Sequence, residues 1–434
     1  MVDGLPRGVG LPALIQTVWS VAAMDSFVRF SLKRYSRERM LAFRVLGVGN
    51  VVSLLDPRLV GELFAGDGEA LRGGEMNRQV FGVLGPNSVL LLDGEPHLRA
   101  RRLLLPPFHG AAIAQHEGLV EEITRSDVED WPVGKEFALL PRMRAITMEV
   151  ILRAVIGVRD PHRREQLADL LPAFAKGGVF GLLLQTRFPS LADGPVAART
   201  PWARDRARAE LLLIDEIAEH RAHPENRTDV LAQLVAARDE NGEPLGEREL
   251  RDHLLTLLGA GHDTTAAALS WCFHHVLRNP QALAHVTNHP DDHAYLTAVV
   301  NESMRLRPVA DSVARKLATP FQLGNYRLPA GTIVAAPINA IHHSPALYTD
   351  PYSFQPERFL EQRPAPYTLI PFGGGERRCI GASFALMELK TVLRTILTHV
   401  RLKPLNPRHE RPNRTRSVAI TPKRGVPVTA TRHI

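Results

Sequence analysis

Apolar residues recur along most of the chain at the spacing that places them on one face of a helix. Asp or Thr stands at the start of several of these segments, as N-cap residues do. The pattern predicts helices over Asp25–Met40, Asp56–Phe64, Asp93–Leu105, Ile113–Trp131, Pro141–Ile156, Pro161–Ala175, Trp202–His220, Thr228–Asp239, Glu247–Arg278, Ala294–Leu306 and Gly381–Val400. We therefore expect a mainly helical protein.

Alternating apolar and polar positions, which indicate strands, are confined to short regions. They are Phe43–Leu55, Phe321–Ala336 with a turn at Gly324-Asn325, and Ser417–Ala430. Prolines make Ala346–Pro371 irregular. The predicted fold class is mainly α (α+β), with small sheets near both ends. Because no linker-like stretch interrupts the chain, we expect one domain over residues 1–434.

Composition narrows the class of protein. Apolar residues make up 44% and charged residues 23% of the 434 residues, as in soluble globular proteins. The two cysteines, Cys272 and Cys379, are too few for a disulfide framework or a four-ligand zinc cluster, and favour a reducing, cytoplasmic setting. The apolar run Leu11–Met24 is interrupted by polar residues and is too short to span a bilayer. We expect no membrane span.

The net charge of +7 favours an anionic partner. Aromatic residues are only 6% of the chain, and no lysine-rich arm or known nucleic-acid motif is present. These features argue against nucleic acid and favour an acidic protein as the partner.

The segment 371–381 contains the pattern F-x-x-G-x-R-x-C-x-G, formed by Phe372, Gly375, Arg377, Cys379 and Gly381. Its chance occurrence in this chain is on the order of one in ten thousand. The glycines allow the backbone to approach a flat ligand. The cysteine stands just before a predicted helix, whose dipole favours a thiolate. Backbone donors near Gly381 can point at the sulfur, and Arg377 is placed to meet a carboxylate.

With this motif, the chain resembles the cytochrome P450 family. The resemblance implies that family's fold, a large helical part with small antiparallel sheets. It also implies that Cys379 is the axial thiolate ligand of haem b iron, with Phe372, Arg377 and Gly381 beside the cofactor. O2 would be the co-substrate.

Two further motifs stand in the family's order. Glu302 and Arg305 form E-x-x-R on one helix face, a pattern that by itself is usually a surface ion pair. The resemblance adds Arg358 and implies a structural network that holds the cysteine loop. His97 and Arg101, four residues apart, together with Arg315, are implied to bind the haem propionates. A lone pair of this kind is more often a solvated helix face.

The long helix predicted over Glu247–Arg278 contains Gly259 and Gly261, each of which costs about 1 kcal/mol in a helix interior. We expect the helix to open locally there, with Thr264 bonding back to a carbonyl one turn earlier. By resemblance, Asp263 and Thr264 form the acid–alcohol pair that relays protons to bound oxygen. Without the cysteine motif, a kinked helix with a surface aspartate would be the better interpretation.

The resemblance also places a substrate pocket, which would include Leu84, Ala260, Val309, Val313 and Val418. Their apolar character favours a terpenoid, fatty acid or steroid. Asp311 departs from the small or apolar residue usual at its position, and either faces solvent or anchors a polar group of the substrate.

The implied function is a monooxygenase that hydroxylates or epoxidises a small apolar substrate. No electron-carrying module is attached, so two electrons would come from a separate acidic ferredoxin or flavodoxin with its reductase. Arg99, Arg102 and Arg378 would form its docking patch on a monomeric enzyme. A peroxide-driven enzyme would not need the Asp263–Thr264 pair. An electron carrier or gas sensor, the remaining alternative, would not need the apolar pocket.

Overall fold

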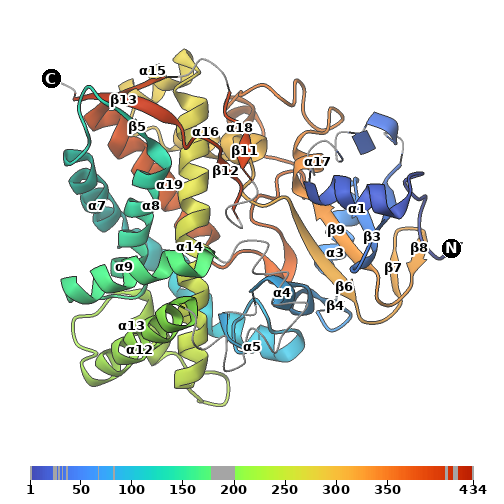
Figure 1. Ribbon diagram of the computed structural model, residues 1–434, viewed down its shortest axis with the longest axis horizontal. Coiled ribbons are helices and arrows are strands. Elements are labelled where there is room, and N and C mark those ends of the chain that lie inside the picture. The colour runs from blue at the N-terminus through green and yellow to red at the C-terminus, as the bar shows by residue number, and fades with distance from the viewer. Residues whose placement is uncertain are drawn as a thin grey trace.

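The fold is built around one long central helix. The computed structural model describes residues 2–22, 27, 30–31, 33–35, 38–66, 68–81, 84–176, 201–405, 409–413 and 419–432. Helix α14 (Glu247–Val276) crosses the molecule, with helices on both sides of it and the largest sheet on one side only (Figure 1). Twenty-one of its thirty residues are buried, among them polar residues such as Asp252, His253 and Asp263.

The helices occupy most of the predicted segments. They are α3 (Pro57–Ala65), α5 (Gly94–Leu104), α6 (Ala111–Ala114), α7 (Glu117–Glu129), α8 (Leu139–Val150), α9 (Pro161–Lys176), α12 (Pro201–Ala222), α13 (Val230–Ala236), α16 (His293–Leu306) and α19 (Ala382–His399). The prediction Ile113–Trp131 was wrong in its continuity, because a turn at Gln115–His116 separates α6 from α7. The prediction Asp25–Met40 was wrong at its end, because Met40 pairs with Leu54 as the first residue of a strand.

The remaining helices were not predicted. They are α1 (Ala13–Ala22), α4 (Gly73–Phe81), α15 (Pro280–Asn288), α17 (Ile338–His342) and α18 (Arg358–Glu361). The described residues also form three shorter turns, a 3-10 turn over Pro106–Phe108, a π-helical turn over Ile151–Val155 that extends α8, and a 3-10 turn over Gly375–Arg377. No helix in the part of the chain that the structure describes has both the length and the apolar character needed to cross a membrane.

Each predicted strand region contains strands. The largest sheet has the order β2 (Met40–Val45), β3 (Gly49–Leu54), β9 (Ile333–Pro337), β6 (Ser312–Leu317) and β4 (Leu71–Arg72). The smaller sheets are β1 (Val2–Asp3) with β8 (Tyr326–Leu328) and β7 (Phe321–Leu323), β10 (Val400–Pro404) with β13 (Pro427–Arg432) and β5 (Glu136–Ala138), and β11 (Pro412–Asn413) with β12 (Thr421–Pro422).

The resemblance implied antiparallel sheets, but two strand pairs differ. Strands β3 and β9 pair in parallel, and so do β1 and β8. Both pairs join segments more than two hundred residues apart in the chain, so no hairpin turn dictates their direction. The sheets are therefore mixed.

The loop that carries Cys379 lies between the helices around α14 and the largest sheet. On the helical side, Phe372 and Ile380 pack against the core that surrounds α14. On the sheet side, a Cβ atom on Gly373 would lie 3.3 Å from Val313 of β6, and one on Gly374 would overlap Phe64 of α3. The loop thus joins the sheet to the helices, immediately before α19 begins.

Candidate active site around Cys379

The backbone of the 371–381 loop holds Cys379 at a fixed position. The Cys379 N–H donates to the carbonyl of Phe372, at 3.0 Å. The Arg378 N–H donates to the carbonyl of Gly375, also at 3.0 Å. Helix α19 starts directly afterwards, with Gly381 at its N-cap position. The thiol therefore stands at the start of an 18-residue helix, as the sequence predicted.

Two observations describe the surroundings of the Cys379 thiol. Its side chain is exposed, yet burial is the main cause that raises the pKa of the thiol. Both observations hold if the sulfur is accessible to a small molecule but lies far from bulk solvent. The Gly381 N–H, Arg101 and Arg378 all act in the opposite direction and lower this pKa. The expected preference for thiolate is thus opposed by burial, and a cation at the sulfur would restore it.

The glycines of the loop serve packing against α3. A Cβ atom on Gly375 would overlap the carbonyl oxygen of Phe64, and Gly375 has a φ of +65°. Gly374 likewise leaves room for the Phe64 ring. Phe64 thus fills the space on the Cβ side of these two glycines, and the approach of a flat ligand to this backbone stays a prediction. Gly381 differs, since no described residue comes within 4 Å of its Cβ position.

Four basic side chains converge beside the loop. The pKa of His97 is lowered to about 3 by burial and by the charges of Arg377, Arg101 and Arg315. Burial and the charge of Arg377 lower the pKa of Arg315 to about 10. Like charges are thus held close together at partly buried positions, a costly arrangement unless an anion joins them. Asp93 offsets only part of this charge.

Asp93 is a residue of the site that the sequence did not reveal. Its Oδ1 atom lies 2.5 Å from the guanidinium of Arg377, which also donates to the Leu92 carbonyl. The same carboxylate accepts from the N–H groups of Gly74 and Glu75, at 2.7 and 2.9 Å. The position of Asp93 had suggested that it caps α5, but its side chain makes no cap hydrogen bond there. Its oxygens accept from the N–H groups at the start of α4 instead.

The middle of α14 has a short exposed stretch. Gly259 and Ala260 are exposed although most of α14 is buried. Thr264 donates to the carbonyl of Ala260 at 2.6 Å, the back-bond that the sequence predicted. The helix nevertheless continues without a break, so the predicted local opening was wrong. Gly261 has a packing reason, because a Cβ atom there would lie 2.5 Å from Ile151 Cδ1 in the π-helical turn.

Asp263 is the neighbour of Thr264 in the chain, and its carboxylate is bound by an arginine of another helix. Its Oδ1 accepts from Arg144 of α8, with the Nε of that guanidinium at 2.7 Å. The Asp263 side chain is only 11% exposed, whereas that of Arg144 is 41% exposed. The ion pair therefore connects the buried carboxylate with the protein surface.

The remaining pocket candidates have mixed outcomes. Leu84 is buried, and its Cδ2 would lie 3.5 Å from a Cβ atom on Gly259, so it borders the exposed part of α14. Val313 adjoins Gly373 of the cysteine loop. Val309 accepts the N–H of Ile420 through its carbonyl, at 2.9 Å. Val418 lies outside the residues that the structure describes.

Asp311 has a structural partner. Its carboxylate accepts a hydrogen bond from the side-chain amide of Asn339 at 3.0 Å, and its carbonyl accepts the Ile338 N–H at 2.9 Å. These bonds tie the start of β6 to α17. The carboxylate is thus engaged within the protein, which answers the question that its unusual position raised.

The segment 84–92 is fastened to α14 by a buried carboxylate that sequence reasoning also missed. Asp252, fully buried, accepts from the backbone N–H and side-chain amide of Asn87, at 3.0 and 2.9 Å. Gly85, with φ of +92°, leaves room for this carboxylate. Ser88 is bonded to Thr256 at 2.7 Å, one turn further along α14. These contacts fix the segment that presents Leu84 to Gly259.

The E-x-x-R residues form a buried network behind the loop. Arg305 donates to both oxygens of Glu302, at 2.6 and 2.8 Å, and both side chains are fully buried. Arg358 donates to the same carboxylate at 3.2 Å. Arg305 also donates to the carbonyls of His342 and Pro351, both at 2.7 Å. The network therefore fixes α16 against the irregular segment that leads to the cysteine loop.

The expected basic docking patch is weaker than the sequence suggested. Arg99 pairs with Asp239 and Glu249, at 2.7 and 3.0 Å. Arg102 pairs with Glu95 at 2.5 Å. These carboxylates offset the charges of two of the three predicted arginines. Arg378 is exposed on the cysteine loop itself, close enough to Arg101 for its charge to lower the pKa of that guanidinium.

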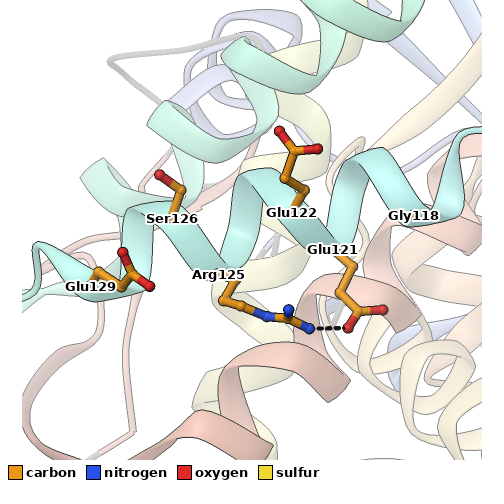
Figure 2. A pocket seen from close by; sticks show the side chains of 6 residues that line it. All are labelled: Gly118, Glu121, Glu122, Arg125, Ser126 and Glu129. Atoms are coloured by element: carbon orange, nitrogen blue, oxygen red, sulfur yellow. Dashed lines mark hydrogen bonds and ion pairs between the residues drawn. The ribbon is translucent and has the colours of Figure 1, made fainter.

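A surface hollow of about 360 Å³ lies away from this site. Figure 2 shows its lining on α7, where Arg125 donates to Glu121 at 2.5 Å. Its other lining residues are Gly118, Glu122, Ser126 and Glu129. All six belong to one helix, and none belongs to the cysteine loop or α14, so the hollow is separate from the Cys379 site.

Comparison with known proteins agrees with this geometry. A family model described as Cytochrome P450 matches residues 40–428. Cytochrome P450 135B1 of Mycobacterium tuberculosis is 41% identical, with 99% of this chain and 93% of that protein covered. Cytochrome P450 137 of the same organism is 37% identical, with 98% and 90% covered.

Solved structures share the fold. The retinoic acid-bound cyanobacterial CYP120A1 is 25% identical, with a TM-score of 0.82 and coverage of 99% of this chain and 100% of that one. The haem domain of cytochrome P450DA is 23% identical, with a TM-score of 0.84 and coverage of 99% and 98%. This second likeness concerns the fold alone.

Proposed function

Because this chain belongs to the cytochrome P450 family of haem monooxygenases, we propose that it inserts one oxygen atom of O2 into a small apolar substrate by hydroxylation or epoxidation. Two electrons would come from a separate redox protein. The observation that carries this proposal is the exposed thiol of Cys379, whose pKa is raised by burial, beside a cluster of basic side chains.

The residues around Cys379 fit haem b. Cys379 would supply the iron ligand, with the Gly381 N–H donating to its sulfur. Arg101, Arg315 and Arg377 would hold the two propionates, whose negative charges relieve the repulsion within the cluster. His97 is neutral in this surrounding and would serve as a hydrogen-bonding partner. When bound, haem supplies the redox chemistry that activates O2.

The proton path rests on α14. The Thr264 hydroxyl donates to the carbonyl of Ala260, and Asp263 is connected to the protein surface by its ion pair with Arg144. We assign these two side chains to proton movement toward the oxygen site, because a carboxylate and an alcohol in sequence can pass a proton along hydrogen bonds.

An apolar substrate fits the residues near the exposed part of α14. Leu84 borders Gly259, and Val313 adjoins the cysteine loop. The solved structure of CYP120A1, which has the same fold, is bound to retinoic acid. Terpenoids, fatty acids and steroids are therefore the substrate classes to test.

The test is isotope incorporation by the haem-containing protein. We would incubate it with a surrogate ferredoxin, its reductase and NADPH, and supply each substrate class under 18O2. The proposal predicts a product with one 18O atom from at least one class, and less product per NADPH from Thr264→Ala. Electron consumption without incorporation for every class would contradict it.

A further inference from the structure

A cluster of basic side chains lies where α14 ends, away from the Cys379 site. The ring of His274 is bonded to that of His409, with the two nitrogens 3.3 Å apart, and Arg278 donates to the His274 carbonyl at 3.1 Å. His274 is ten residues beyond Thr264, which is about 15 Å along the helix. Strand β12 lies beside this helix (Figure 1).

Two further arginines and a glutamate join the cluster from other segments. The guanidinium of Arg424, after β12, lies 3.4 Å from the carboxylate of Glu410. Arg307, at the end of α16, lies over the Trp271 ring at 5.5 Å, and this ring is 5.5 Å from the His274 ring. The α14-end cluster, as we call it, comprises His274, Arg278, Arg307, His409, Glu410 and Arg424.

The buried part of the cluster contains two imidazole rings. His274 and its neighbour His275 are only 1% and 9% exposed, and their ring centres are 5.2 Å apart. The Nδ1 atom of His274 and the Nε2 atom of His275 have no hydrogen-bond partner among the described residues. Buried polar atoms in this situation are usually satisfied by a bound water or ion.

Positive charge in the α14-end cluster is only partly compensated. Burial and the neighbouring charges, of which that of Arg278 is the largest, lower the pKa of His274 to about 3, so this ring is neutral at pH 7. Burial also lowers the pKa of Arg278, Glu410 raises it, and the charge of Arg424 lowers it further. Like charges at partly buried positions are costly unless an anion joins them.

We propose that the α14-end cluster binds the phosphate group of a soluble small molecule, held by Arg278, His409 and Arg424. His409 and Arg424 are exposed, so such a group can reach them from solvent. The three arginines and one carboxylate of the cluster leave two positive charges, and a phosphate monoester carries about 1.5 to 2 negative charges at pH 7. Guanidinium groups match phosphate oxygens in geometry as well as in charge.

Other occupants fit this place less well. A metal ion would be repelled by the arginines, and in the part of the chain that the structure describes no three His, Cys, Asp or Glu side chains are arranged to hold one. An acidic protein surface would not reach His274 and His275, which are almost fully buried. The dipole of α14 favours cations at this end of the helix, but Arg307 and Arg424 come from other segments.

The test is isothermal titration calorimetry of the haem-containing protein with inorganic phosphate, with sodium chloride of equal ionic strength as the reference. The variants Arg424→Gln and His409→Gln each remove a proposed phosphate ligand, and Glu410→Gln removes the negative charge of the cluster. The control is Arg125→Gln on α7. Arg125 and Arg424 each pair with one glutamate, and their side chains are 51% and 45% exposed.

Thermal unfolding and the carbon monoxide spectrum would check that each variant folds and holds haem. We expect the wild type and the control to bind phosphate equally, and Arg424→Gln to bind it at least about tenfold more weakly, as the loss of a charge-assisted hydrogen bond implies. His409→Gln should also weaken binding. Glu410→Gln should tighten it about threefold or more, because a repelling charge is lost.

The opposite sign expected for Glu410→Gln separates binding from stability, since a merely destabilised protein would not gain affinity. The proposal is overturned if phosphate gives no more heat than chloride, or if Arg424→Gln binds phosphate as tightly as Arg125→Gln. It is also overturned if Glu410→Gln weakens binding. Should Arg424→Gln fail to fold, the proposal stands or falls with His409→Gln and Glu410→Gln.

Discussion

The guanidinium of Arg377 lies 2.5 Å from Asp93 Oδ1, and this ion pair joins the loop of Cys379 to the residue that precedes α5. The His97 and Arg101 side chains come from α5 itself. The contact therefore sets the distance between the thiol and two of the basic side chains assigned to the propionates.

Replacing Arg377 by Leu should loosen haem. The change removes one cation of the cluster and frees Asp93, so haem should leave at least about tenfold faster, as when a supporting partner of a metal site is lost. The measurement is haem transfer to apomyoglobin. Arg102→Leu, which removes an exposed arginine from surface ion pairs, is the matched control. Equal transfer rates in the two variants would contradict the assignment of Arg377.

The two glycines of α14 should respond in opposite ways to alanine. Gly261→Ala forces a methyl group against Ile151 and should lower the free energy of unfolding by about 1–3 kcal/mol. Gly259→Ala meets only Leu84, at 3.5 Å, and should raise it by up to about 1 kcal/mol through helix propensity. Urea unfolding of the haem-containing variants measures both. Similar losses at the two positions would show that both glycines serve packing.

These residues also show what the sequence could and could not predict. The motif around Cys379 predicted the fold family because its residues are close in the chain and their spacing is specific. Two glycines in a helix had two physical explanations, and only the position of Ile151 decides between them for Gly261. The partners of Arg377 and Asn87 are 284 and 165 positions away, beyond any local pattern.

Charge was the least predictable property. Arg99 and Arg102 looked like a free basic patch, but their carboxylate partners stand near α13 and at the start of α14. In α1, the hydrogen bonds of Gln16 turn this polar side chain inward and leave Leu14 and Val18 exposed, which the apolar run Leu11–Met24 did not indicate. In both cases tertiary contacts outweigh the local pattern.

Asp252→Asn should weaken substrate binding by more than its loss of free energy of unfolding explains. The change removes the nearer of the two carboxylates that pair with Arg251, at 2.7 Å, and weakens the hold on the 84–92 segment. Affinity for an apolar ligand, read from the spin-state change in the absorbance spectrum, should fall about fivefold or more, which corresponds to the loss of about 1 kcal/mol from one hydrogen bond.

Asp229→Asn provides the matched control. Asp229 is also a buried carboxylate beside a glycine of positive φ, Gly157, and it caps α13 through the Ala232 N–H at 2.8 Å. The Asp229→Asn variant should lose about as much free energy of unfolding as Asp252→Asn and keep its ligand affinity. Parallel losses of affinity in both variants would refute a positioning role for Asp252.

Glu388 should make stability depend on pH. Burial raises the pKa of this carboxyl to about 8, and its Oε1 atom has no hydrogen-bond partner among the described residues. Between about pH 4.5 and 8 the unfolded chain binds fewer protons here than the folded one, so stability falls as pH rises. Glu388→Gln lacks this dependence and should gain up to about 4 kcal/mol over the wild type between pH 4.5 and 7.5.

The check on Glu388 is denaturant unfolding of both proteins across this pH range. The gap between them should be smallest near pH 4.5, where the carboxyl is protonated in the folded state and half protonated in the unfolded chain. A constant difference at every pH would mean that the carboxyl does not titrate as its burial requires.

The most direct test of haem-thiolate ligation by Cys379 is the absorbance spectrum of the dithionite-reduced protein with carbon monoxide, measured beside Cys379→Ser. If Cys379 ligates the iron as thiolate, the wild type shows a strongly red-shifted Soret band that the variant lacks. A histidine-type carbonyl spectrum in folded, haem-loaded wild-type protein would contradict this ligation, because the thiolate would then be absent from the iron.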